Sequence, residues 1–296
     1  MSQTSPFGRA TQTLDLGHSR VPYYRVGRGP DLVFIHGWPL HSATFRELVP
    51  RLADCFTCHL FDLPGTGESE WGVQSKISLT DHAHSVRQIV DQLGLQHYGI
   101  LAHDSGAVIA RLAAAEDARV QGLVLGNTEI AGYRAWQIEL FLRIEGIPFG
   151  PQLFGLALRL RAVRHASFAY GGCFRDPEFA EGEFRRLFFD PLQRSGRRSL
   201  GQRRLLQTLD LELIDRLGEV DARIRAPVHF IWGADDPYFP LARLKPTLPQ
   251  FGGGASLAVI PSGKLYAHEE FPAQFADEAR AFLLRSLTRQ TSAVTA

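Results

Sequence analysis

The sequence predicts an α/β fold in which a mostly parallel, doubly covered sheet carries an inserted helical lid. Three observations support this prediction. Short apolar segments alternate with amphipathic segments up to about residue 130. From there to about residue 217 the pattern is helical. Strand-like segments then return, so we interpret the helical segment as an insertion that lies over the carboxyl ends of the strands, where ligands bind in such sheets.

We assign residues 1–129 and 222–296 to the core and residues 130–221 to the lid. Each predicted strand is a short apolar run, and each predicted helix has apolar residues at helical spacing. Ser42 caps the start of one helix, and Gly94 ends another. In order, we predict strands at 13–16, 21–26 and 31–35, a helix at 42–53, a strand at 56–61, a helix at 80–93, a strand at 98–102 with its helix to about 116, strands at 120–125, 228–231 and 257–260, and a helix at 272–287.

The composition is that of an ordinary globular protein, with 45% apolar residues, 21% charged residues and a formal net charge of +1. This near-neutral charge argues against nucleic acid or an anionic membrane as the main partner. No run is long and apolar enough to span a bilayer, and the first residues lack the apolar core of a signal peptide. We therefore expect a cytoplasmic protein. Neither metal-ligand spacing nor a phosphate-binding glycine loop is present, so we predict no metal and no cofactor.

The segment around Asp104 is the strongest functional signal in the chain. An apolar strand that starts at Tyr98 breaks into a turn with Ala102 and Gly106 on either side of Asp104, and a helix follows. A sharp strand-to-helix turn of this kind raises its central side chain above the sheet and needs small neighbours. A carboxylate at that position is suited to attack a saturated or strained carbon and to form an alkyl-enzyme ester.

A second frame makes Ser105 the nucleophile of an esterase or lactonase. It places the bulky His103 where the turn needs a small residue. It also lengthens the strand by one residue before the turn. The sequence therefore favours Asp104 over Ser105.

Two further loops follow predicted strands. His36-Gly37-Trp38-Pro39 comes directly after the third strand, where the backbone of such a loop forms half of an oxyanion hole. This assigns the amides of Trp38 and Ser105 to the developing negative charge, while His36 either packs beside the loop or reaches the pocket. A late strand runs into Gly233-Ala234-Asp235-Asp236, and Asp236 is preferred over Asp235 as the acid of a catalytic triad.

These motifs resemble those of α/β-hydrolases of the haloalkane dehalogenase and epoxide hydrolase branch. The resemblance rests on four motifs and their order: His36-Gly-Trp-Pro39, Asp62-Leu-Pro-Gly-Thr-Gly-Glu-Ser69, Ala102-His-Asp-Ser-Gly106 and Trp232-Gly-Ala-Asp-Asp-Pro237. It covers about residues 20 to 287. It implies cofactor-free hydrolysis at an sp³ carbon of a small apolar substrate, with Asp104 as nucleophile.

The chain departs from the branch beside the nucleophile. Haloalkane dehalogenases place a tryptophan there to hold the leaving halide, whereas this chain has Ser105. The loss of that halide clamp favours an epoxide over an alkyl halide. Epoxide hydrolases protonate the epoxide oxygen with lid tyrosines, and the resemblance makes Tyr133 and Tyr170 candidates for this role.

A second departure concerns the base. The resemblance predicts a histidine after the last strand, but ungapped alignment puts Leu265 at that position. His268 stands three residues later and is the best remaining candidate. Either the loop shifts so that His268 acts as the base, or the base is absent. Without a base the protein would be a covalent trap, a ligand-binding protein or an isomerase.

Overall fold

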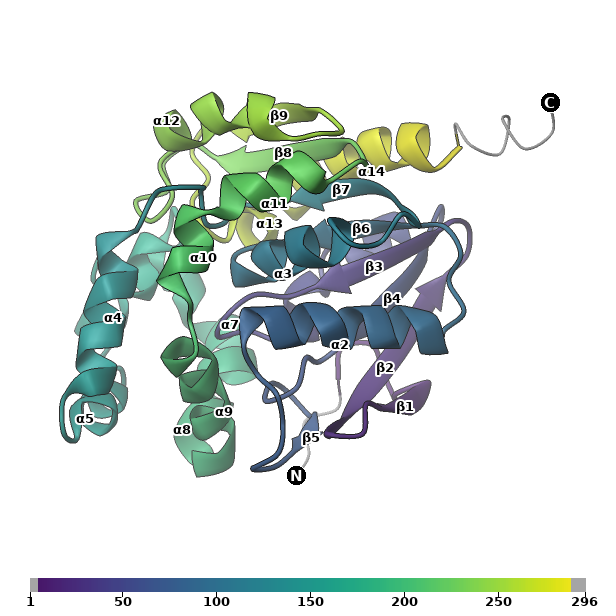
Figure 1. Cartoon of the computed structure of the whole chain (residues 1–296). Helices are drawn as coiled ribbons and strands as arrows, with labels where there is room; N and C mark the ends of the chain where they lie inside the picture. The colour runs from purple at the N-terminus through teal and green to yellow at the C-terminus, as the bar shows by residue number, and fades with distance from the viewer. Residues whose placement is uncertain (1–4, 289–296) are drawn as a thin grey trace, which may run out of the picture.

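The computed structural model describes residues 5–288 and contains a nine-stranded sheet (Figure 1). The strand order is β1-β2-β4-β3-β6-β7-β8-β9, with β5 paired to β2. All pairs from β4 to β9 along this order are parallel, whereas β1, β2 and β5 pair antiparallel. The strands are β1 (Gln12–Asp15), β2 (Ser19–Gly27), β3 (Asp31–Ile35), β4 (Thr57–Phe61), β5 (Glu70–Trp71), β6 (Tyr98–Ala102), β7 (Val120–Leu125), β8 (Val228–Gly233) and β9 (Ala255–Ile260).

Helices cover both faces of the sheet, as predicted. In β3, Val33 packs into one hydrophobic core and Phe34 into the other, because neighbouring residues of a strand point to opposite faces. Figure 1 shows α2 and α3 over one face and α14 on the other. The core helices are α1 (Val49–Leu52), α2 (Leu79–Gln92), α3 (Ser105–Ala114), α12 (Leu241–Leu244), α13 (Ala267–Glu270) and α14 (Pro272–Thr288), with the 3₁₀ helices η1 (Ser42–Phe45) and η5 (Lys245–Gln250).

The predicted helical insertion is confirmed. Between β7 and β8, the described chain forms helices and turns that extend from one end of the sheet (Figure 1). These elements are α4 (Trp136–Gly146), α5 (Gly150–Ala157), α6 (Arg161–Arg164), η2 (Tyr170–Gly172), η3 (Pro177–Ala180), α7 (Gly182–Phe184), the π-helical turn η4 (Arg185–Phe189), α8 (Asp190–Arg194), α9 (Gly196–Gln207), α10 (Leu211–Asp215) and α11 (Leu217–Arg223). The division at residues 130 and 221 stays a prediction, since α11 also packs against the core helix α3.

Several local features differ from the prediction, among them the short helices α12, η5 and α13, which were not predicted. The expected helix at 42–53 splits into η1 and α1, and Pro50 stands in the first turn of α1. Proline has no N–H to donate to the preceding turn, so a continuous helix through this position is disfavoured. The short strand β5 was not predicted, because two residues carry no periodic pattern.

Several hydrogen bonds hold the lid against the core. The indole Nε1–H of Trp38 donates to the Gln202 carbonyl at 3.0 Å, and the Tyr266 amide donates to the Cys173 carbonyl at 3.1 Å. Arg46 connects the lid to the core by an ion pair with Glu183 at 3.1 Å and a second with buried Glu269 at 2.8 Å. These contacts enclose the space between the lid and the strand ends. Of the helices in residues 5–288, none has the length and apolar character needed to cross a bilayer.

A buried ion pair fixes α3 to α11. Arg111 Nε donates to Asp221 Oδ1 at 2.7 Å, and both side chains are almost fully buried. Asp221→Asn would leave the guanidinium buried without its counter-charge, so we expect a loss of ~3–5 kcal/mol in the free energy of unfolding. Urea denaturation measures this loss. The matched control is Asp215→Asn in the exposed Arg134 pair, which should shift the midpoint little. Equal shifts in both variants would contradict the prediction.

Candidate active site

Asp104 lies at the turn between β6 and α3, with φ 51° and ψ −144°. This conformation is rare for a residue with a side chain. The turn needs neighbouring residues that have no side chain. A Cβ on Gly106 would lie 2.4 Å from the His36 carbonyl oxygen, and a Cβ on Gly37 would lie 2.6 Å from Asp104 Cβ. The small residue predicted at Gly106 is therefore required, and Gly37 is a second such position that the sequence did not indicate.

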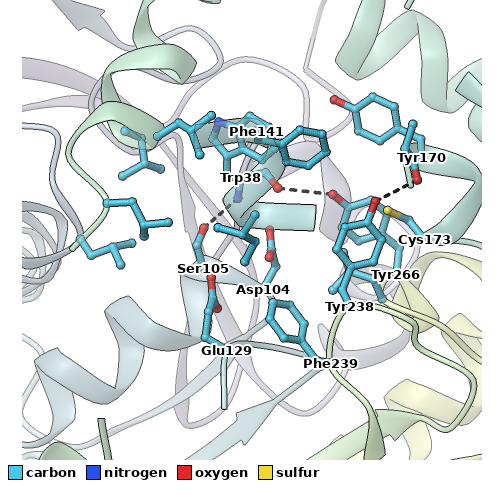
Figure 2. A pocket seen from close by; sticks show the side chains of 17 residues that line it. Trp38, Asp104, Ser105, Glu129, Phe141, Tyr170, Cys173, Tyr238, Phe239 and Tyr266 are labelled. Atoms are coloured by element: carbon cyan, nitrogen blue, oxygen red, sulfur yellow. Dashed lines mark hydrogen bonds between the residues drawn. The ribbon is translucent and has the colours of Figure 1, made fainter. Parts of the chain in front are cut away.

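A pocket opens above Asp104, between the core and the lid (Figure 2). Its polar groups are few, and its walls are mostly apolar, as in many small-molecule sites. The residues with polar side chains around it are Trp38, Asp104, Ser105, Glu129, Tyr170, Cys173, Tyr238 and Tyr266. The apolar walls consist of Leu79, Ile138, Phe141, Ala169, Leu205, Leu206, Leu209, Phe239 and Leu265.

The pocket shifts the protonation of Asp104. Burial raises the pKa of the Asp104 carboxyl well above its usual range, and the neighbouring Glu129 carboxyl raises it further. Hydrogen bonds from the backbone amides of Ser105 and Trp38 act in the opposite direction. The Trp38 amide also lies 2.9 Å from Ser105 Oγ, to which it donates. The two amides assigned from sequence thus lie at the carboxyl group.

Glu129 is a pocket residue that the sequence interpretation missed. It follows β7 and is only 5% exposed. Burial raises the pKa of its carboxyl group. The signal was available, because the polar run 127–129 comes directly after a buried strand, at the sheet edge where ligands bind.

Asp236 is buried behind the pocket, whereas Asp235 is exposed. Asp236 Oδ1 accepts from the Tyr238 amide at 2.7 Å, and Oδ2 accepts from Asn127 Nδ2 at 2.7 Å. Burial raises the pKa of Asp236 to about 7. The preference for Asp236 over Asp235 fits this placement. The side chain that contacts the Asp236 carboxylate is the Asn127 amide, however, and not a histidine.

The expectation that His268 acts as the base does not fit the geometry. His268 Nε2 lies 2.8 Å from Thr44 Oγ1, and Thr44 in turn donates to Glu269 Oε1 at 2.8 Å. The His268 ring packs on the His103 ring at a centroid distance of 4.0 Å. The short helix α13 turns His268 into this cluster, while Leu265 faces the pocket. No histidine is among the lining residues of this pocket in the described part of the chain.

The three weaker candidates for pocket residues, Tyr170, Tyr133 and His36, lie in different places. Tyr170 lines the pocket, as the resemblance implied (Figure 2). Tyr133 lies outside it, under the guanidinium of Arg243. His36 is buried behind the oxyanion loop, where Nε2 accepts from the Leu63 amide at 3.1 Å, so it packs and hydrogen-bonds in place of contacting the pocket.

The buried position of His268 has a consequence for stability. Burial lowers its pKa from 6.5 to about 3, and the Arg46 charge contributes. As pH falls below about 6.5 the unfolded chain takes up the proton first, so this contribution to stability is present above that pH and lost toward pH 3. We expect the difference in unfolding free energy between wild type and His268→Gln to change by up to ~1.4 kcal/mol per pH unit in that window. Urea denaturation at several pH values measures it, with His97→Gln as the exposed control. Parallel pH profiles for wild type and His268→Gln would contradict it.

Comparisons with known proteins agree with this architecture. The family model described as alpha/beta hydrolase fold matches residues 30–272. The chain is similar to Haloalkane dehalogenase 2 of Mycobacterium tuberculosis (strain ATCC 25618 / H37Rv), with 28% identity over 280 residues, 93% of this chain and 94% of that protein. It is also similar to the Soluble epoxide hydrolase of Corynebacterium sp. (strain C12), with 37% identity over 94 residues, 31% of this chain and 32% of that protein.

A solved structure, Epoxide hydrolase CorEH without ligand, shares the fold with a TM-score of 0.78 and 22% sequence identity. The match covers 93% of this chain and 98% of that chain. The family match and the sheet with its helical insertion lead to one assignment. The chain belongs to the α/β-hydrolase fold family.

Proposed function

We propose that the protein is a hydrolase in which Asp104 attacks an sp³ carbon of a small apolar substrate and forms an alkyl-enzyme ester. The observation that carries this proposal is the Asp104 carboxyl at the floor of an apolar pocket, with the backbone amides of Trp38 and Ser105 beside it. A carboxylate nucleophile divides a difficult displacement into two easier steps. The two amides stabilise the negative charge that develops on the ester carbonyl when water adds.

An epoxide fits this pocket better than an alkyl halide. A leaving halide needs N–H donors, but the indole N–H of Trp38 is already bonded to the Gln202 carbonyl. Ser105 follows the nucleophile, and its hydroxyl oxygen accepts from the Trp38 amide. An opening epoxide needs a proton donor instead. Burial raises the pKa of two pocket residues, Tyr170 and Glu129, so the pocket contains neutral groups that can donate a proton.

The covalent route is tested with oxygen-18 water and styrene oxide under single-turnover conditions. The new oxygen of the first diol comes from Asp104, so we expect unlabelled diol and label in the peptide that contains Asp104. Asp104→Asn should lose at least ~10³-fold in turnover, because an amide is a poor nucleophile. Label in the first diol would mean direct attack by water and would contradict the proposal. A stable adduct without diol would instead indicate a covalent trap.

The esterase alternative makes a different prediction for Ser105. No histidine lines the pocket within the described residues, so the Ser105 hydroxyl has no imidazole base there. Ser105→Ala keeps the backbone amide, and we expect it to retain styrene oxide hydrolysis within ~10-fold of wild type. Diol formation followed by chromatography measures this. Loss of activity in Ser105→Ala, with activity kept in Asp104→Asn, would favour the serine mechanism.

A further inference from the structure

We propose that Glu129 is the catalytic acid and base of this site, in place of the histidine whose position Leu265 occupies. Glu129 protonates the oxygen of the opening epoxide and then accepts a proton from the water that hydrolyses the Asp104 ester. This inference rests on the proposed function, because it assumes the Asp104 ester.

Glu129 and Asp104 line the same pocket, and Figure 2 shows both side chains on its floor beside Ser105. Thr128 connects them. Its Oγ1 lies 2.8 Å from the Asp104 carbonyl oxygen and 2.9 Å from Glu129 Oε2. Both carboxyl-bearing residues are therefore fixed to one buried hydroxyl.

The contacts of the Thr128 hydroxyl bear on the protonation of Glu129. Its hydroxyl has one proton, but both neighbours are oxygen atoms that ordinarily accept. The Asp104 carbonyl can only accept. Both contacts are satisfied when Thr128 donates to that carbonyl and a protonated Glu129 donates to Thr128. The hydrogen-bond geometry thus suits a neutral Glu129.

The charges around the two carboxyl groups also bear on their protonation. The nearest buried cation, Arg111, is already paired with Asp221, and its third contact is with the Glu129 backbone carbonyl at 2.8 Å. Two ionised carboxylates in this apolar pocket would repel each other without full compensation, so the pair holds one proton. Backbone amides from Trp38 and Ser105 favour the charge on Asp104. The Arg111 charge in turn favours the charge on Glu129. The two carboxyl groups therefore share one proton, which can pass between them, and the contacts of Thr128 suit its place on Glu129.

The other ionisable groups near the pocket are neutral or occupied. Asp236 accepts from two backbone amides and from Asn127. Burial raises the pKa of the Cys173 thiol well above its usual range. The hydroxyl of Tyr238 donates to lid carbonyls, and that of Tyr266 donates to the Trp38 carbonyl at 3.3 Å. Burial raises the pKa of the Tyr170 hydroxyl, so it can donate a proton but does not take one from water. Among the described lining residues, Glu129 is the group best placed to do both for a substrate on Asp104.

The steps balance. An Asp104 carboxylate oxygen bonds to the epoxide carbon, the ring C–O bond breaks, and the freed oxygen takes the Glu129 proton. Water then adds to the ester carbonyl carbon and gives a proton to the Glu129 carboxylate. As the tetrahedral intermediate collapses, Glu129 returns that proton to the departing alcohol oxygen. Asp104 is left protonated and passes its proton to Glu129, so epoxide plus water gives a diol.

The test compares two electrophiles on Glu129→Gln. Styrene oxide needs an acid for ring opening, whereas benzyl bromide expels bromide without one. We expect benzyl bromide to alkylate Asp104 of the variant at the wild-type rate, within ~10-fold, while ester release slows by ~10²–10⁴-fold. With styrene oxide, alkylation itself should slow by a similar factor. Intact-protein and peptide mass spectrometry follow the adduct on Asp104.

Controls separate the two proposals. Glu116→Gln changes an exposed carboxyl on the core and should behave as wild type. Alkylation of Glu129→Gln by benzyl bromide reports that its site is folded. If the variant does not fold, Glu129→Asp keeps the carboxyl group and should retain measurable release. Wild-type release from Glu129→Gln would overturn the role of Glu129 alone, whereas absence of any Asp104 adduct in wild type would overturn the nucleophile and this inference with it.

Discussion

The backbone conformation of Asp104 is the constraint on which the rest of the site depends. A residue held at φ 51° and ψ −144° costs about 1–3 kcal/mol, so the surrounding structure must fix it. The Asp104 amide donates to the Asn127 carbonyl at 2.7 Å, and its carbonyl accepts from Thr128 at 2.8 Å. Gly37 and Gly106 give the turn its clearance. The carboxyl group is thereby held at one place on the pocket floor.

The polar run 127–129 after β7 organises more than the turn. Asn127 Nδ2 lies 2.7 Å from Asp236 Oδ2, and Asn127 Oδ1 accepts from the Gly233 amide at 2.7 Å, so β7 and β8 are joined at their carboxyl ends. Thr128 contacts Asp104, and Glu129 enters the pocket. This short segment thus contacts or contains the residues of three carboxyl groups, Asp104, Glu129 and Asp236, each of which follows a different strand.

Local sequence patterns were enough to predict the fold, but they predicted only part of the candidate site. The strands β3, β4, β6, β7, β8 and β9 are apolar runs between turn residues, so both their existence and the insertion after β7 were predictable. The turn at Asp104 was predictable from its small neighbours. The direction of His268 was not, because it depends on how α13 packs Thr44 and Glu269 against the core. The polar run 127–129 after β7 pointed to the correct edge of the sheet, but the sequence did not show which of its side chains faces the pocket.

The apolar lining of the pocket also bears on how a reaction cycle would end. A substrate that gains two hydroxyl groups while it lies among Leu205, Leu209 and Phe141 becomes poorly matched to these walls. Each hydroxyl buried there without a partner costs roughly 1–3 kcal/mol. In the proposed epoxide hydrolysis, the diol would therefore be held more weakly than the epoxide from which it forms. The same leucine and phenylalanine side chains that gather the substrate would promote product release, and the enzyme would be subject to little product inhibition.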